Sequence, residues 1–541
     1  MWSIGWAKAE IQLPLQGLAM HGYGQPHHRA RRQRTPLYAR SFSVQQQGQP
    51  PLLLCCLDLG YVTGAIREAL LLRLRPQMDE AWTPARLMLT CTHTHSGPGG
   101  CAHELIYNLV TPGYQEAHVE AIVHAAETSL RAALASAATA ELVPAEALID
   151  ERVEVAWNRS MNAYRRNPET PAYADEEAHR ALDRHMRTLS VWREGELRAL
   201  IALFGVHATC LGNSLDAYDG DNKGYAAAMT ESRLGDEAVA IFAQGSAGDV
   251  SPHYHGPGQW RRRLALRDEA AEVAYARRNG AMQAQAALQQ AAQYGPALQG
   301  DLDAVFAYID FSAQKIDERL AGQAGACTSP AALGISFIVG TPVDGRGISP
   351  WLGRALRPLS RLLRQQRCRQ EPDAMKNIDA AQGVKDIFLD AGDRRIMGLG
   401  LEQIKNLAWI DPLARSLSTA VRRGEAQQRP FLPSILPLQI VRLGALALIC
   451  APGEFTTVAG QRLLQTLRPS LARIGIRELY LCTYCNEYMG YVTTYEEYQE
   501  QAYEGGHNVF GQWSLAAFQQ NFLMLAEQLA RPAEERQCVG G

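Results

Sequence analysis

The chain has 541 residues, of which 47% are hydrophobic and 20% charged, and its net charge is -3 at neutral pH. This composition is ordinary for a globular protein with a large core, and the balanced charge argues against nucleic acid as the main partner. We find no run of about 20 apolar residues and no signal peptide. Eleven cysteines, many in apolar runs, are typical of buried thiols in a reducing compartment. We therefore expect a cytoplasmic protein.

Apolar runs of strand length alternate with helical patterns along the chain, which predicts an α/β fold with a large mixed sheet. We expect strands at 51–57, 86–90, 188–193, 197–206, 238–243, 441–450 and 477–482. We expect helices at 63–75, 114–138, 457–467 and 515–530. The alanine- and glutamine-rich stretch from 259 to 321 shows no strand pattern and predicts a pair of helices broken near Gly295 and Pro296. Without repeats or linkers, the chain reads as a single domain, 1–541, with a helical insertion at about 257–330.

The segment CTHTHSGPGG places two histidines at the end of a predicted buried strand. His93 and His95 are two residues apart, so on an extended segment both would face the same side. Neutral imidazole nitrogens at this spacing suit zinc or another borderline metal. Two hydrogen-bonded loop histidines are the alternative.

Two further strand ends carry candidate metal ligands. His207 follows an apolar strand in LFGVHATC, and Glu454 follows another in APGEFTT. A buried carboxylate is costly unless it is paired or bound to a metal, although Glu454 could also be a first-turn helix residue favoured by the dipole. Together with the histidine pair, these residues form a plausible catalytic zinc set with an open position.

The loop QGSAGDVSPHYHG follows the strand predicted at 238–243 and contains Ser251. A serine on a sharp loop beside a metal could act as an activated nucleophile, or it could simply shape the turn before Pro252. The loop lacks the Gly-x-Ser-x-Gly elbow of ordinary α/β-hydrolases. We expect His253 and His255 to lie outside the ligand set.

In this order, CTHTHSGPGG, GVHATC, GDVSP, APGEFTT and YVTTYEEYQEQAYEG resemble motifs of the neutral/alkaline ceramidases. The resemblance extends to WNRSMNAYRRNP and ALGISFIVGTPVDG and covers most of the chain, while the segment at about 346–430 matches poorly. Members of that family are zinc-dependent amidohydrolases that cleave the N-acyl bond of ceramide.

The resemblance implies a role for each of eight residues. The ligands of one zinc ion would be His93, His207, Glu454 and Tyr491, and the catalytic residues would be Ser251, His95, Arg159 and Tyr503. His95 would face the substrate beside the metal, Ser251 would be the nucleophile, and Arg159 with Tyr503 would hold and polarise the scissile amide.

Some features depart from that family. Its members usually carry an export signal and an immunoglobulin-like C-terminal domain, and we expect this chain to lack both. These differences spare the catalytic residues but leave the substrate open: ceramide or a related lipid-like N-acyl compound. An acyltransferase or cyclase of specialised metabolism, with a nucleophile other than water, is the alternative, and a non-catalytic zinc protein is a weaker one. The sequence does not indicate an oligomeric state.

Overall fold

The protein is described by a computed structural model, which defines residues 2–111, 113–254, 268–341, 344–345, 347–404 and 412–536. The expected pair of helices begins at 259, so its first residues, like His255, lie outside the described residues. No helix in these ranges is long and apolar enough to cross a membrane.

The largest element is an eight-stranded mixed sheet with the strand order β13-β11-β10-β8-β1-β4-β5-β6. Its β5–β6 and β11–β13 pairs are parallel and its other neighbours are antiparallel. The strands are β1 (Trp2–Glu10), β4 (Tyr38–Gln45), β5 (Leu52–Leu57), β6 (Leu87–Cys91), β8 (Ala138–Leu148), β10 (His185–Arg193), β11 (Glu196–Leu203) and β13 (Val239–Ala243).

A four-stranded sheet packs against the large one. Its order is β15 (Leu302–Asp310), β19 (Ile435–Leu443), β20 (Leu446–Cys450) and β22 (Glu478–Cys482). Side chains that alternate along β5 show how the layers form, because successive residues of a strand face opposite sides. Leu52, Leu54 and Cys56 join the apolar cluster between the two sheets, whereas Leu53, Cys55 and Leu57 join the cluster beneath the outer helices.

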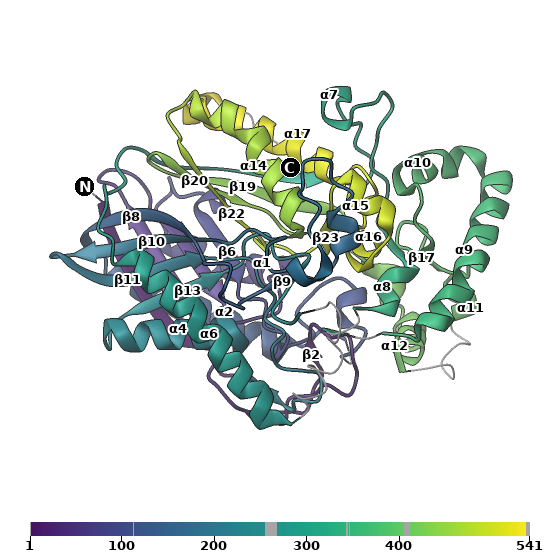
Figure 1. Ribbon diagram of the computed structural model, residues 1–541, viewed down its shortest axis with the longest axis horizontal. Coiled ribbons are helices and arrows are strands. Elements are labelled where there is room, and N and C mark those ends of the chain that lie inside the picture. Colours follow the sequence, from purple (N-terminus) through teal and green to yellow (C-terminus); the bar gives the residue numbers. More distant parts are fainter. Residues whose placement is uncertain are drawn as a thin grey trace.

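Helices cover the outer faces of both sheets, so the molecule is a four-layered sandwich (Figure 1). The large sheet is covered by α1 (Gly64–Leu74), α2 (Glu116–Ala135), α4 (Asp221–Leu234) and α6 (Glu269–Ala291). The small sheet is covered by α14 (Thr457–Ala472) and α17 (Ser514–Leu529). The α/β fold with a mixed sheet is therefore confirmed.

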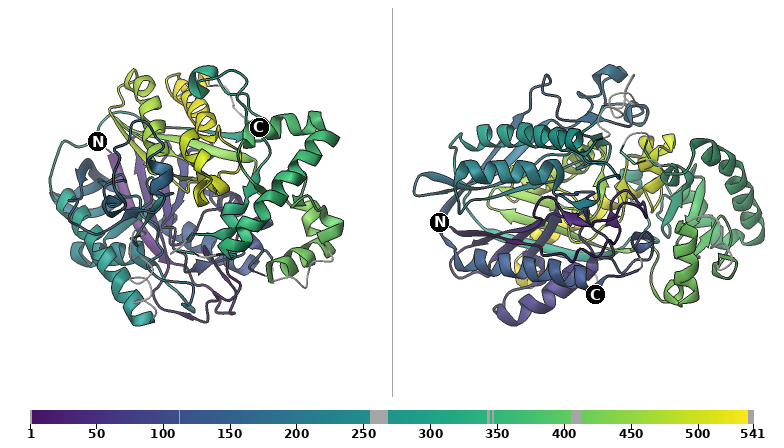
Figure 2. Two further views of the ribbon diagram at one scale, coloured as in Figure 1. Left: turned by 45° about the vertical axis from the view of Figure 1, so that its right-hand side comes forward. Right: turned by 90° about the horizontal axis from the view of Figure 1, so that it is seen from below.

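A mainly helical region projects from one side of the sandwich, as both Figure 1 and Figure 2 show. It comprises β16 (Ala332–Gly334), α8 (Ile335–Val339), α9 (Pro350–Gln370), α10 (Pro372–Gln382), β17 (Ile387–Asp390), β18 (Arg395–Ile396), α11 (Leu401–Ile404), α12 (Pro412–Arg422) and α13 (Glu425–Gln428). This region contains the segment at about 346–430, where the sequence showed no clear pattern.

Two sequence expectations are wrong. Where a second helix was expected before 321, residues 302–310 form the strand β15, which pairs with β19 over nine residues and belongs to the small sheet, and only α7 (Glu318–Ala321) is helical. The segment at about 257–330 is therefore not a purely helical insertion. The strand expected at 441–450 is instead part of a hairpin, in which β19 and β20 are joined at Gly444, whose φ of +64° suits a tight turn. The other expected strands and helices are confirmed to within a few residues.

Candidate functional site

The first part of the site lies where two strands of the large sheet end. His93 follows β6 and His207 follows β11. The two loops are joined by a parallel bridge between Thr94 and Ala208, and the backbone N of His95 donates to Ala208 O at 3.3 Å. This pairing brings the three histidines of two separate segments into one buried group.

The second part comes from the small sheet. After β20 and β22 the chain forms two short strands, β21 (Glu454–Phe455) and β23 (Tyr491–Val492), which pair in parallel. Glu454 and Tyr491 are direct partners in this register, so their side chains leave the backbone side by side.

All of these side chains meet at one point. The Nε2 atom of His207 lies 3.1 Å from Glu454 Oε2 and 3.2 Å from Tyr491 Oη. His93 Nε2 lies 3.7 Å from the same Glu454 oxygen and 3.1 Å from His95 Nε2. In the part of the chain that the structure describes, His93, His95 and His207 form a group whose ligand atoms all lie within 4.8 Å of one another.

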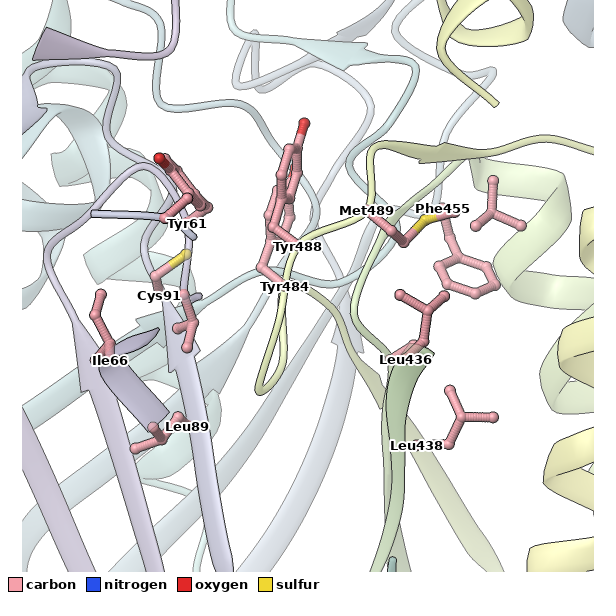
Figure 3. Close-up of a cluster of buried hydrophobic side chains, with 14 of the residues drawn as sticks. Tyr61, Ile66, Leu89, Cys91, Leu436, Leu438, Phe455, Tyr484, Tyr488 and Met489 are labelled. Atoms are coloured by element: carbon pink, nitrogen blue, oxygen red, sulfur yellow. The ribbon is translucent and has the colours of Figure 1, made fainter. Parts of the chain in front are cut away.

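Hydrogen bonds from outside the group fix the direction of each ligand atom. Nδ1 of His93 contacts Gly60 O and Nδ1 of His207 contacts Val250 O, so each ring turns its Nε2 toward the centre. Glu454 accepts from Tyr484 Oη at 2.9 Å and from Tyr488 Oη at 2.6 Å. Figure 3 shows these two tyrosines side by side, between β6 on one side and β19 on the other. Such outer contacts are what orients the ligands of a metal site.

The electrostatics of the group favour metal binding. Burial lowers the pKa of His93 to about 4 and that of His95 well below its usual value, so both rings are neutral at physiological pH. Burial alone would raise the pKa of Glu454, but His93, His207 and Tyr488 together hold it well below its ordinary range. Neutral imidazoles beside an ionised carboxylate form a donor set that suits a divalent metal ion. The residues present therefore fit a metal.

Ser251 lies on a short strand beside this group. β14 (Val250–Ser251) pairs with β9 (Trp157–Asn158), and the Ser251 side chain is fully buried. Its hydroxyl donates to Asp344 Oδ1 at 2.8 Å and accepts from the backbone N of His253 at 3.0 Å. The serine thus donates to an adjacent carboxylate, a group that can accept its proton.

Arg159 connects the serine to the candidate metal ligands. Its guanidinium donates to Tyr491 Oη at 3.0 Å and to Gly248 O at 2.8 Å, and it forms ion pairs with Glu504 at 2.8 Å and Asp344 at 3.3 Å. The guanidinium carbon lies 5.5 Å from the centre of the Tyr503 ring. Burial raises the pKa of the Tyr503 hydroxyl, which therefore stays protonated and able to donate.

The structure thus brings all eight candidate residues of the sequence into one buried region. Four contact residues were not identified from the sequence: Asp344, Glu504, Tyr484 and Tyr488. Their contacts depend on segments far apart in the chain. The sequence signal for Asp344 was its place as the second-last residue of the segment ALGISFIVGTPVDG, which resembles a family motif. His253 lies beside Ser251 and its ring is 3.1 Å from Thr209 O, outside the histidine group.

The fold resembles that of solved ceramidases. A solved ceramidase complexed with C2 aligns with a TM-score of 0.80 and 28% identity, covering 100% of this chain and 77% of that one. The neutral ceramidase crystal structure from Pseudomonas aeruginosa aligns with a TM-score of 0.78. In sequence, the neutral ceramidase of Pseudomonas aeruginosa is 30% identical over 98% of this chain and 72% of its own length. That of Mycobacterium tuberculosis is 31% identical over 98% of this chain and 77% of its own length.

A family model described as neutral/alkaline non-lysosomal ceramidase, N-terminal, matches residues 2–400 and 416–520. The chain belongs to this family.

Proposed function

We propose that this protein is a zinc-dependent amidohydrolase that cleaves the N-acyl bond of ceramide or of a related lipid-like N-acyl compound. Family membership and the 30–31% identity to two neutral ceramidases support the reaction class. The observation that carries the proposal is the convergence of His93, His207, Glu454 and Tyr491 on one point, with Ser251 and Arg159 alongside.

In the proposed site, His93, His207, Glu454 and Tyr491 hold one zinc ion, and His95 faces the substrate. When bound, zinc supplies a Lewis acid for a carbonyl oxygen and lowers the pKa of a water molecule. Arg159, fixed by Glu504 and Asp344, presents a positive charge where the carbonyl oxygen of the amide becomes negative. Tyr503 donates a hydrogen bond to the same oxygen, because its hydroxyl stays protonated.

Ser251 provides the nucleophile in the leading form of this mechanism. Its proton passes to Asp344, the acceptor 2.8 Å away, as the oxygen attacks the amide carbon. His95 lies beside the proposed metal ligands and has a neutral ring, so it can accept a proton and pass it to the departing amine. A water molecule then takes the acyl group from Ser251, and the serine regains its proton. In the competing form, water attacks directly and Ser251 only positions the substrate.

The decisive experiment measures hydrolysis of N-acylsphingosines and simpler N-acyl amines together with metal content, for the wild type, His93→Ala and Ser251→Ala. We expect one zinc ion per chain and amide cleavage in the wild type, and loss of both in His93→Ala. Ser251→Ala should keep the metal but lower kcat by at least about 10²-fold. A wild type that cleaves no N-acyl amide while holding zinc would contradict the proposed reaction. Product in which the acyl group has moved to another amine, without net hydrolysis, would favour acyl transfer.

An acyl group trapped on Ser251 by rapid quenching would establish the serine mechanism. Incorporation of labelled solvent oxygen with no covalent species, and near-normal turnover by Ser251→Ala, would instead establish direct attack by water.

A further inference from the structure

Helix α9 carries an exposed apolar stripe that nothing in the described structure covers. Trp351 is 77% exposed, Leu352 51%, Leu359 45% and Leu362 54%. At 3.6 residues per turn, these positions and Ala355 fall on one side of the helix. The opposite side, which includes Gly353 and Ser360, is buried against the protein. Exposed large apolar residues gathered on one helix face are a sign of a binding surface.

The same helix is strongly basic. Between 350 and 370 the sequence has six arginines and no acidic residue. Arg364 and Arg367 point inward and are neutralised by Asp379 and Asp390 at 2.5 and 2.6 Å. Arg361 pairs with Asp386, yet its side chain remains 63% exposed.

Two further arginines, Arg354 and Arg369, are exposed on the outer side. The Arg354 guanidinium lies over the Trp351 ring, 5.0 Å from its centre. The chain as a whole has a net charge of -3, so the positive charge of this face differs from the charge of the whole molecule.

The helix is attached directly to the catalytic region. Its first turn packs on α8, because Gly353 has no side chain and lets Val339 approach: a Cβ there would lie 2.5 Å from Val339 Cγ2. On α8, the Phe337 ring lies 5.6 Å from Tyr503 and 4.2 Å from His507. Asp344, the partner of Ser251, precedes the start of α9 by six residues. A surface bound at α9 would therefore lie close to the active site.

We propose that α9 is an interfacial helix that docks the protein on an anionic lipid bilayer. Trp and Leu side chains on one face, with arginines beside them, are the composition of helices that lie in the headgroup region of a membrane. The arginines supply electrostatic attraction to anionic lipids. Figure 1 and Figure 2 show α9 at the outer edge of the molecule, where a flat surface can reach it. The inference rests on the proposed lipid amide substrate, which is itself a membrane component.

The test is co-sedimentation of the full chain with vesicles of phosphatidylcholine alone and of phosphatidylcholine mixed with phosphatidylglycerol. The wild type should bind the mixed vesicles more tightly than the neutral ones. The double variant Trp351→Gln/Leu362→Gln should bind at least about tenfold more weakly, since two apolar side chains lose their burial. Arg354→Gln/Arg369→Gln should lose the preference for anionic vesicles. Leu72→Gln is the matched control, because Leu72 is 78% exposed on α1, away from α9.

Cleavage of a short-chain, water-soluble N-acylsphingosine separates this inference from the proposed function. We expect the α9 variants to cleave it at the wild-type rate while losing activity on vesicle-embedded substrate. If the wild type cleaves the soluble substrate but does not bind vesicles, or if the Trp351→Gln/Leu362→Gln variant binds as well as Leu72→Gln, the docking proposal is overturned. If that variant instead changes the mass of the protein in solution without vesicles, the face contacts a second copy and the proposal is likewise overturned. Failure to cleave any N-acyl amide would contradict the proposed function and leave the vesicle test valid.

Discussion

At the scale of single residues, the geometry of the site depends on backbone carbonyls that fix imidazole rings. His93 has a φ of +65°, an uncommon conformation for a residue other than glycine. This backbone turn lets its Nδ1 reach Gly60 O and directs Nε2 toward Glu454. His207 achieves the same orientation through Val250 O. Strain of this kind persists where the surroundings hold it, and it is commonly found at functional sites.

Substitution of Asp344 should impair the activation of Ser251 and the placement of Arg159 while leaving metal binding intact. Asp344→Asn removes the charge that accepts the Ser251 proton at 2.8 Å and pairs with Arg159 at 3.3 Å. We expect kcat to fall by about 10²-fold or more, with zinc content unchanged, because general-base assistance contributes 10²–10⁴-fold. Steady-state kinetics across pH, with metal analysis, is the measurement.

Thr209→Val is the control for Asp344→Asn. It removes only the longer hydrogen bond to the same carboxylate, 3.3 Å, and should lower kcat less than tenfold. A near-normal kcat in Asp344→Asn would show that Ser251 needs no carboxylate.

The candidate ligands His93, His207 and Glu454 could be proposed from the sequence because each follows an apolar strand, whereas Tyr491 came from the resemblance. Asp344 could not be predicted from the residues alone. It is one of 56 acidic residues, and its contacts to Ser251 and Arg159 join segments 93 and 185 residues apart. Nothing local in the sequence indicates such contacts.

At the scale of elements, two glycines show how helix packing reaches the site. Gly280 on α6 faces α4, where a Cβ would lie 2.6 Å from Asn222 O. Asn222 Nδ2 in turn donates to His207 O at 3.1 Å. Gly224 on α4, by contrast, has open space where its Cβ would be.

Alanine substitutions at these two glycines should therefore change the free energy of unfolding in opposite directions. Gly224→Ala should stabilise the protein by about 0.5–1 kcal/mol, because alanine is the better helix former. Gly280→Ala gains the same propensity but forces α4 and α6 apart, and overpacking costs about 1–3 kcal/mol. Urea unfolding gives the free energy of unfolding of both variants. The zinc affinity of Gly280→Ala tests whether the displacement of α4 reaches His207. Equal stabilisation by both substitutions would show that α4 and α6 adjust freely.

The elements that the sequence did not predict share one property, which is that their strand pairing leaves no local pattern. β15 follows an alanine- and glutamine-rich helix and contains two alanines, which have low strand propensity. Its partner, β19, begins 125 residues after β15 ends, so the pairing leaves no local signal. Strands β5 and β6 were found because they are short, fully buried apolar runs bounded by clear helix patterns.

At the scale of the whole molecule, the candidate metal site joins the two sheets at one end of the sandwich. His93 and His207 follow strands of the large sheet, whereas Glu454 and Tyr491 follow strands of the small one. An ion held by all four residues would add a direct link between two layers that already meet through an apolar cluster and through hydrogen bonds such as that from Gln439 Nε2 to Leu87 O. Metal binding at such a position contributes to stability as well as to chemistry, because the unfolded chain does not form the site.

Removal of the metal should therefore lower the melting temperature. At free zinc about 1,000 times its Kd, binding adds about 4 kcal/mol to the free energy of unfolding, and for a chain of this length that corresponds to a few degrees. Calorimetry before and after chelation, with metal content measured in parallel, tests this. His93→Ala should melt near the chelated wild type and show no response to chelator, while returned zinc should restore only the wild type. If the wild type loses its metal without any change in melting temperature, the ion does not bridge the two sheets.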